Sequence, residues 1–421
     1  MLRALPTLIF VVASLLCAPA TSAQQTISLE QAWSEAQQSG AAIRIAQARA
    51  ESADARALVA SQWWLPEVRL GAGYHALSGA EINAPGELIT DAAQRSVDLG
   101  AGLSATWTPA VSLGASAAAN LEAVAATHDL ASVRSSAHLS TAWAYYDLLE
   151  AEQTEQAMDR WILSNNTWSS ELRALVGAGL APEFSALLIE SAGQSLLADQ
   201  AAAAATRSAA TARLQLQMGS TSEKIRCAET ELLFEAISRG QTIERPESLA
   251  AQARLDAAQQ LHKTALHQPF LPSIRVGAAS GVFGTDLPDL YGRRGADASL
   301  SWRIPLDRIF GAGGAAKLRQ SDALIAQQEL AAISHRQVVQ RNNAHNGLVA
   351  AISRYQAAYS AEQIAARALE QSTQRLALDI AEPQEVFIVR QAAIEAELDR
   401  ISAAAAAYRA QLWLSYTNGL L

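Results

Sequence analysis

The sequence contains 421 residues, of which 50% are hydrophobic and 17% are charged, and its formal net charge is −9. This acidic balance argues against nucleic acid as a partner, because a phosphate backbone attracts basic surfaces. The two cysteines are Cys17 and Cys227, and Cys17 lies in a segment that we expect to be removed on export. The mature chain would then form no internal disulfide.

Residues 1–23 have the pattern of a secretory signal peptide. One basic residue, Arg3, precedes an apolar run over 8–18, and small residues directly before the cleavage point complete the pattern. A lipid-anchored form would begin at Cys17, but the bulky Leu16 before it disfavours that cleavage. No later stretch approaches the ~20 apolar residues of a membrane-spanning helix.

Two structural repeats are predicted for the mature chain, 24–220 and 221–421. The Leu-Pro pair at 65–66 recurs at 271–272, an offset of 206 residues (271 minus 65). A later segment, 181–219, recurs at 381–419, an offset of 200 (381 minus 181). Matches in the same order along the chain indicate a duplication of one unit, consisting of a helix, two strands and a pair of long helices.

The predicted strands alternate apolar with polar or glycine residues over about ten positions. We expect them at about 67–77, 96–108, 273–283 and 296–304. Such alternation is typical of transmembrane β-strands, which meet lipid on one face and water on the other. The aromatic residues predicted to mark the membrane–water boundary are Tyr74, Trp107 and Trp302. A soluble sheet with one buried face is the alternative that the strands alone leave open.

Four strands are too few to close a transmembrane barrel, since the smallest barrels have eight. An open sheet in lipid would leave unpaired backbone groups that cost several kcal/mol each. If the strands cross a membrane, copies of the chain must therefore combine them. Three copies would supply twelve strands around a water-filled lumen, and the strand count permits this number without requiring it.

Long helices are predicted in pairs, over 113–218 and 313–418. Each pair is interrupted by a single proline, Pro182 or Pro383, and proline inside a helix costs ~3 kcal/mol. Their apolar residues follow the alternating three-and-four spacing of coiled coils. One such seam consists of Ile394, Leu398, Ile401, Ala405, Tyr408 and Leu412. The predicted fold class is therefore a mixed α+β membrane protein with coiled-coil-like helices.

Several segments resemble, in order and spacing, those of the TolC-like outer-membrane efflux family. They are 64–68 (Trp-Leu-Pro-Glu-Val), 142–149 (Ala-Trp-Ala-Tyr-Tyr-Asp-Leu-Leu), 179–188 and 245–247. The resemblance spans essentially the whole mature chain. It implies a homotrimer whose twelve-stranded β-barrel lies in the outer membrane of a Gram-negative bacterium and continues as an α-helical barrel across the periplasm. The implied function is a passive exit duct of a tripartite efflux or type I secretion system, gated at its periplasmic helical ends.

The resemblance also implies partners and functional residues. The partners are outer-membrane lipid, a periplasmic adaptor protein and an inner-membrane pump of the RND or ABC type. The implied adaptor-contacting positions at the helical ends are Gly179, Pro182 and Pro383. The implied pore constriction consists of Asp379, Glu382 and Glu385, which three copies would arrange as acidic rings that favour cations. Alternatively, these carboxylates stabilise the N-terminus of the helix that follows Pro383.

The sequence predicts no enzyme. Its seven histidines are scattered, and neither His-Glu-x-x-His nor Cys-x-x-Cys spacing occurs, so we expect no metal and no cofactor. A soluble periplasmic coiled-coil scaffold or adaptor is the alternative function. An adaptor, however, would be expected to carry one helical hairpin rather than duplicated strand and helix pairs. The sequence specifies neither the cargo nor the particular pump and adaptor.

Overall fold

The computed structural model describes residues 25–82, 86, 88–220, 225–229, 234, 243–267, 273–284, 291–301, 306–378 and 380–421. The predicted signal peptide lies outside these residues. The chain divides into two compact units, and each unit combines segments of both predicted repeats. Unit 1 comprises Met1–Ile45, Ala131–Arg245 and Arg336–Leu421, and unit 2 comprises Ala46–Leu130 and Pro246–His335.

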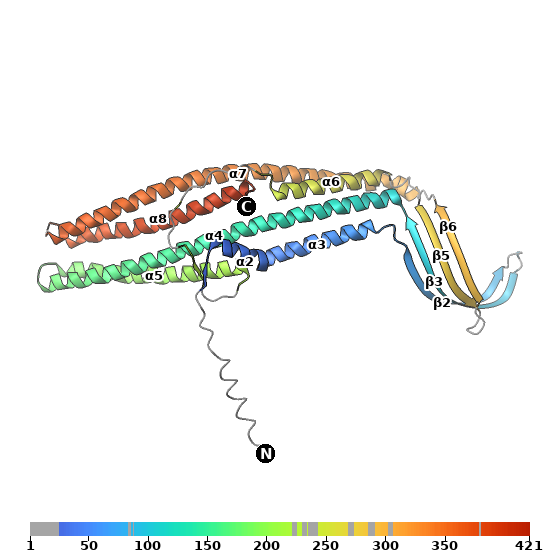
Figure 1. Ribbon diagram of the computed structural model, residues 1–421, viewed down its shortest axis with the longest axis horizontal. Coiled ribbons are helices and arrows are strands. Elements are labelled where there is room, and N and C mark those ends of the chain that lie inside the picture. Colours follow the sequence, from blue (N-terminus) through green and yellow to red (C-terminus); the bar gives the residue numbers. More distant parts are fainter. Residues whose placement is uncertain are drawn as a thin grey trace, which may run out of the picture. The chain divides into compact units, whose positions relative to one another are not determined.

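Unit 2 contains an antiparallel sheet in the order β2-β3-β5-β6 (Figure 1). Its strands are β2 (Glu67–Ile82), β3 (Leu88–Trp107), β5 (Ser273–Gly284) and β6 (Tyr291–Ser301). The hairpin of β2 and β3 extends beyond the predicted ends, because backbone pairing continues past a bulge between Gly79 and Glu81. β6 begins earlier than predicted, and the predicted end of this strand at 302–304, with Trp302, lies outside the described residues.

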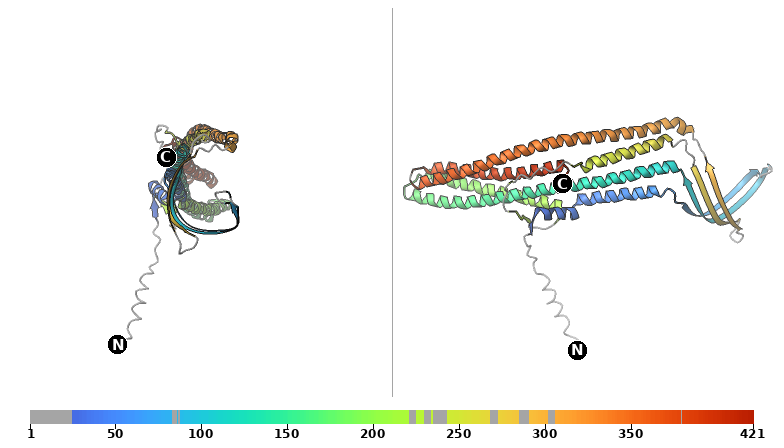
Figure 2. Two further views of the ribbon diagram at one scale, coloured as in Figure 1. Left: turned by 90° about the vertical axis from the view of Figure 1, so that its right-hand side faces the viewer. Right: turned by 45° about the horizontal axis from the view of Figure 1, so that its top comes forward.

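The two faces of the sheet differ in chemistry. The apolar face carries the even-numbered residues of β5, β6 and of β2 up to its bulge, together with the odd-numbered residues of β3. Its large side chains are exposed: Leu70 is 81% exposed and Leu99 is 56% exposed. On the opposite face, Gly71, Gly100 and Gly281 form a row across three strands. A side chain at Gly281 would collide with the Leu99 carbonyl, so glycine permits the close strand approach in this strongly curved sheet (Figure 2).

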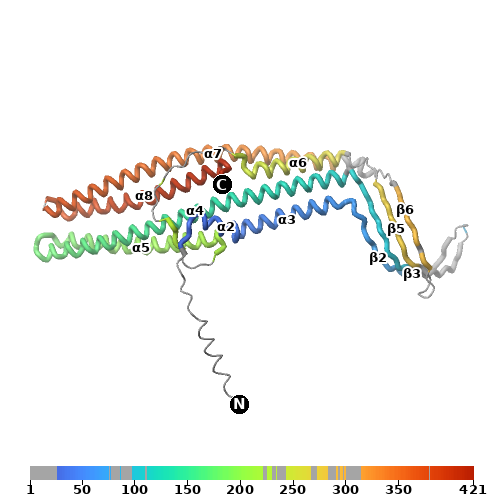
Figure 3. Tube along the Cα trace, in the orientation of Figure 1, coloured from blue at the N-terminus to red at the C-terminus, as the bar shows by residue number. Residues whose placement is uncertain are grey.

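The helices of unit 2 pack through small side chains. They are α3 (Ala41–Ser61), which begins in unit 1, α6 (Pro246–His267), and the adjoining parts of α4 (Pro109–Gly177) and α7 (Leu306–Ala377) (Figure 3). Thr264 of α6 lies so close to Gly114 of α4 that a methyl group at Gly114 would collide with it. Arg254 of α6 also forms an ion pair with Asp129 of α4. None of the described helices is both long and apolar enough to cross a membrane.

Unit 1 consists of two helical hairpins and a short N-terminal helix. The hairpins join α4 to α5 (Glu183–Met218) and α7 to α8 (Pro383–Thr417). The short helix α2 (Leu29–Ser39) begins with a capping box in which Ser28 and Gln31 satisfy each other's backbone N–H groups. The predicted seam supplies Ile401 and Ala405 to the core, which is rich in alanine.

Unit 1 also contains a two-stranded parallel sheet, one strand of which contacts a buried carboxylate. Its strands are β1 (Gln25–Ile27) and β4 (Ile225–Cys227). Glu152 of α4 is 6% exposed, and its Oε2 accepts a hydrogen bond of 3.2 Å from the Cys227 backbone N–H. Its Oε1 lies 3.8 Å from Nε of Arg207. Burial raises the pKa of Glu152 above its ordinary value, although the Cys227 amide and Arg207 oppose the shift.

We predict that Gly219→Ala destabilises unit 1. Gly219 ends α5 with a φ of 65°, in the left-handed region, and a Cβ there would lie 2.8 Å from the Ser39 carbonyl oxygen. The substitution should lower the free energy of unfolding by about 1–2 kcal/mol and therefore lower the melting temperature. Gly177→Ala is the matched control, because nothing lies within 4 Å of a Cβ at that position. Equal melting temperatures for the two variants would contradict the prediction.

We also predict that Glu152→Gln changes how stability depends on pH. The folded state binds the Glu152 proton more tightly than the unfolded state, since burial raises the pKa of this carboxyl. The stability that Glu152 contributes is thus greatest below the ordinary glutamate pKa and falls as the pH rises through the folded pKa. Glutamine retains the acceptor without titrating. The melting temperature of the variant should therefore fall less than that of the parent between about pH 5 and pH 8, and parallel curves would refute this.

Candidate functional site

The ends of the two helical hairpins share one type of backbone hydrogen bond. At the first end, Gly179 adopts a φ of 75°, and the Leu180 N–H donates to the Leu175 carbonyl at 2.9 Å. At the second end, the Ile380 N–H donates to the Arg375 carbonyl at 2.9 Å. With the positive φ of Gly179, the first end is the Schellman termination of a helix, and the described residues of the second end have the same hydrogen bond between residues five positions apart. Asp379, predicted for the pore constriction, lies outside the described residues.

A proline lies at or directly before the first residue of the return helix at both ends. Pro182 precedes α5 with extended backbone angles, and Pro383 is the first residue of α8. Proline suits these positions because its missing N–H would have no partner in the first helical turn. The three predicted adaptor-contacting residues therefore lie at the hairpin turns, with Gly179 and Pro182 in one and Pro383 in the other.

Of the predicted constriction residues, Glu382 and Glu385 are described, and they differ in their contacts. Glu382 precedes α8, is exposed, and makes no capping hydrogen bond through its side chain. Glu385 accepts a hydrogen bond of 2.7 Å from Nη1 of Arg375, and both side chains are partly exposed. Glu385 is therefore paired within its own hairpin. Sequence reasoning missed Arg375, because ten residues of separation (385 minus 375) is not a helical contact distance and the pair forms only once the chain reverses.

The first hairpin carries a comparable ion pair, in which Nε of Arg173 donates to Glu190 at 2.7 Å. Around both ends large apolar side chains are exposed in the single chain: Leu180 is 76% exposed, Leu378 is 69% exposed and Ile380 is 63% exposed. The ends thus combine paired charges with uncovered apolar surface. Such a surface is characteristic of a protein–protein contact.

Arg390 links the two hairpins a short distance from their ends. This α8 residue is 8% exposed, and its guanidinium carbon lies 5.3 Å and 5.4 Å from the ring centres of Trp161 and Trp168 of α4. Its Nη2 donates to the Trp161 carbonyl at 3.5 Å. Burial lowers the pKa of Arg390, and the two ring faces compensate part of the lost hydration of its charge. No local sequence pattern indicated this contact between residues 229 positions apart (390 minus 161).

Two of the three predicted boundary aromatics, Tyr74 and Trp107, are described, and both lie on strands of the sheet. Tyr74, on the apolar face of β2, is 64% exposed. Trp107 lies at the end of β3 next to α4, and its Nε1 donates to the Trp64 carbonyl at 3.1 Å. Among the described residues, no group of three His, Cys, Asp or Glu side chains is arranged to hold a metal ion.

No protein-family model matches the sequence, and no curated protein matches it. Several solved structures match over nearly the whole chain. The open state of the Neisseria gonorrhoeae MtrE outer membrane channel has a TM-score of 0.78 and 19% identity, covering 93% of this chain and 89% of that chain. The outer membrane protein VceC from Vibrio cholerae has a TM-score of 0.75 and 18% identity, covering 93% and 96%. The Campylobacter jejuni CmeC outer membrane channel has a TM-score of 0.75 and 16% identity, covering 93% and 85%.

These structures share the arrangement described above at low sequence identity. The resemblance to the TolC-like family that the sequence motifs indicated is confirmed at the level of the fold. The chain has the fold of these outer-membrane channels.

Proposed function

We propose that three copies of this chain form a passive exit duct in the outer membrane of a Gram-negative bacterium. The sheets of the three copies would close a twelve-stranded β-barrel, and the helices would continue it across the periplasm. The observation that best supports this proposal is the exposed apolar face of the sheet, on which Val68 is 67% exposed and Leu70 is 81% exposed. Burial in lipid stabilises such a face, whereas exposure to water costs about 25 cal/mol per Å².

The opposite face suits a water-filled lumen. It carries Arg69, Asp98, Ser104 and Arg275 among its glycines. Polar side chains and glycine on one face, with exposed leucine and valine on the other, match the lumen and lipid sides of a transmembrane barrel. The fold likeness to outer-membrane channels supports the same reading.

The hairpin ends would serve as the gate and as the contact with other proteins. We propose that Gly179, Pro182 and Pro383 lie where a periplasmic adaptor binds. An inner-membrane pump of the RND or ABC type would supply the energy, in a tripartite efflux or type I secretion system. Glu382 and Glu385, with Asp379, would face the constriction. The exposed leucines of the hairpin ends support a protein contact there. An enzymatic role is not favoured, and a soluble periplasmic scaffold is disfavoured because it would leave the apolar face in water.

Neighbouring residues on opposite faces of β3 test the duct directly. Leu103 lies four residues (107 minus 103) from Trp107, which is about 10 Å of height for a strand tilted by ~40° and therefore near the middle of the membrane. Leu103→Arg should destabilise insertion by about 2–4 kcal/mol and reduce the amount of trimer in outer-membrane fractions. Ser104→Arg, on the lumen face, should leave the trimer intact. A detergent-free, soluble monomer of the parent protein would refute the proposed function.

Ion selectivity tests the constriction. Because Arg375 accompanies Glu385, the pair adds little net charge to the ring. Glu385→Gln leaves Arg375 unpaired and should shift the reversal potential in planar bilayers toward anions. Arg375→Gln leaves Glu385 unpaired and should shift it toward cations. Recordings at low salt suit this test, because the screening length is ~10 Å at 0.1 M. If neither variant moves the reversal potential, the pair does not line the pore.

A further inference from the structure

Among the side chains that the structure describes, one charged side chain interrupts the apolar face of the sheet. Arg294 of β6 is an even-numbered residue of that strand, so it shares this face with Leu70, Leu99 and Val282. It is the only charged residue among the side chains of this face that the structure describes. Its β5 partner in the register is Ser280, the one hydroxyl among the described apolar-face side chains of β5 and β6.

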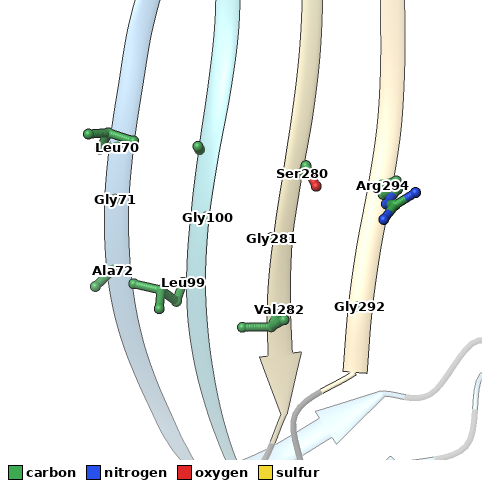
Figure 4. Close-up of a pocket in the computed structure, with 11 residues that line it drawn as sticks. Leu70, Gly71, Ala72, Leu99, Gly100, Ser280, Gly281, Val282, Gly292 and Arg294 are labelled. Atoms are coloured by element: carbon green, nitrogen blue, oxygen red, sulfur yellow. The ribbon is translucent and has the colours of Figure 1, made fainter.

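These residues line a shallow groove across the four strands (Figure 4). Leu70, Leu99 and Val282 supply its apolar wall, and Arg294 and Ser280 supply its polar part. Gly292, on the same face as Arg294, and the backbone of Gly281 also line the groove. Arg294 is exposed, and no described acidic side chain pairs with it. The groove thus offers one cation and one hydroxyl at the edge of a hydrocarbon-like surface.

The position of Arg294 along its strand determines which part of the membrane its side chain would contact. Within β6 itself, seven residues (301 minus 294) separate Arg294 from Ser301, the end nearer α7 along the chain, and three (294 minus 291) separate it from Tyr291 at the other end. At ~3.4 Å per residue and ~40° of tilt, Arg294 lies about 18 Å above Ser301, past the middle of a ~25 Å apolar band that begins at that end of the strand. An arginine in the outer half of the band extends its guanidinium toward the nearer headgroups. It would therefore meet the phosphates of the outer leaflet.

We propose that Arg294 and Ser280 bind a phosphate of lipid A, the phosphorylated glycolipid of the outer leaflet, while its acyl chains lie against Leu99 and Val282. This site rests on the proposed function, because it requires the apolar face to be in the membrane. The planar guanidinium donates two parallel hydrogen bonds to a phosphate, and the serine hydroxyl adds a third. The phosphate in turn neutralises a charge that the hydrocarbon would otherwise exclude.

Lipid retention by the purified trimer tests the site. The protein is reconstituted in phosphatidylethanolamine nanodiscs that contain either lipid A or phosphatidylglycerol, and bound lipid is counted by native mass spectrometry. We expect the parent trimer to retain lipid A about tenfold more tightly than Arg294→Gln, the loss corresponding to one charge-assisted hydrogen-bonding group. Arg294→Lys should recover part of this retention. Arg275→Gln is the matched control, since Arg275 lies on the opposite face.

The possible results distinguish a failure of the proposed lipid A site from a failure of the proposed duct. Equal lipid A retention by the parent and Arg294→Gln trimers would overturn the site and leave the duct standing. Phosphatidylglycerol retained as tightly as lipid A by the parent would overturn the lipid A assignment. A parent protein that forms no membrane-inserted trimer would overturn both proposals, because the apolar face would then meet no lipid.

Discussion

The four-stranded sheet has two open edges, and any assembly of this chain must provide partners for them. Within the described part of the chain, β2 and β6 each pair with one neighbouring strand only. The backbone groups along their outer sides therefore need partners from elsewhere. The exposed apolar face demands a second covering, because leucine and valine side chains cannot remain in water without cost. The proposed closure by sister strands within a lipid bilayer would satisfy both demands with one assembly.

The helical hairpins meet a different constraint. Alanine side chains allow close helix approach, and Ala403, Ala404 and Ala405 are fully buried, but each buries little area. Specific polar contacts therefore help to fix which helices face each other. Arg409 of α8 pairs with Glu150 of α4 at 2.8 Å, and Arg400 of α8 pairs with Glu362 of α7 at 2.8 Å. Arg390 between two tryptophans adds a contact that depends on ring orientation as well as charge.

Local patterns predicted the helices and strands, because side-chain alternation and proline spacing are properties of short segments. The strand ends were harder, since pairing near Gly79 and Glu81 depends on the partner strand rather than on alternation. The three-residue strands β1 and β4 are too short to show a period at all. In the candidate site, glycine and proline marked the turns in advance. The partner of Glu385 could not be predicted, because Arg375 approaches it only through the reversal of the chain.

The matched lengths of the two return helices have a consequence for how such a chain can change. α5 has 36 residues and α8 has 35, and both hairpin ends lie at the same end of unit 1 (Figures 1 and 2). An insertion of one helical turn in each arm of a single hairpin would displace its end by about 5.4 Å relative to the other. Viable length variants should therefore carry compensating insertions in both halves of the gene, so that indels in this architecture are inherited in pairs.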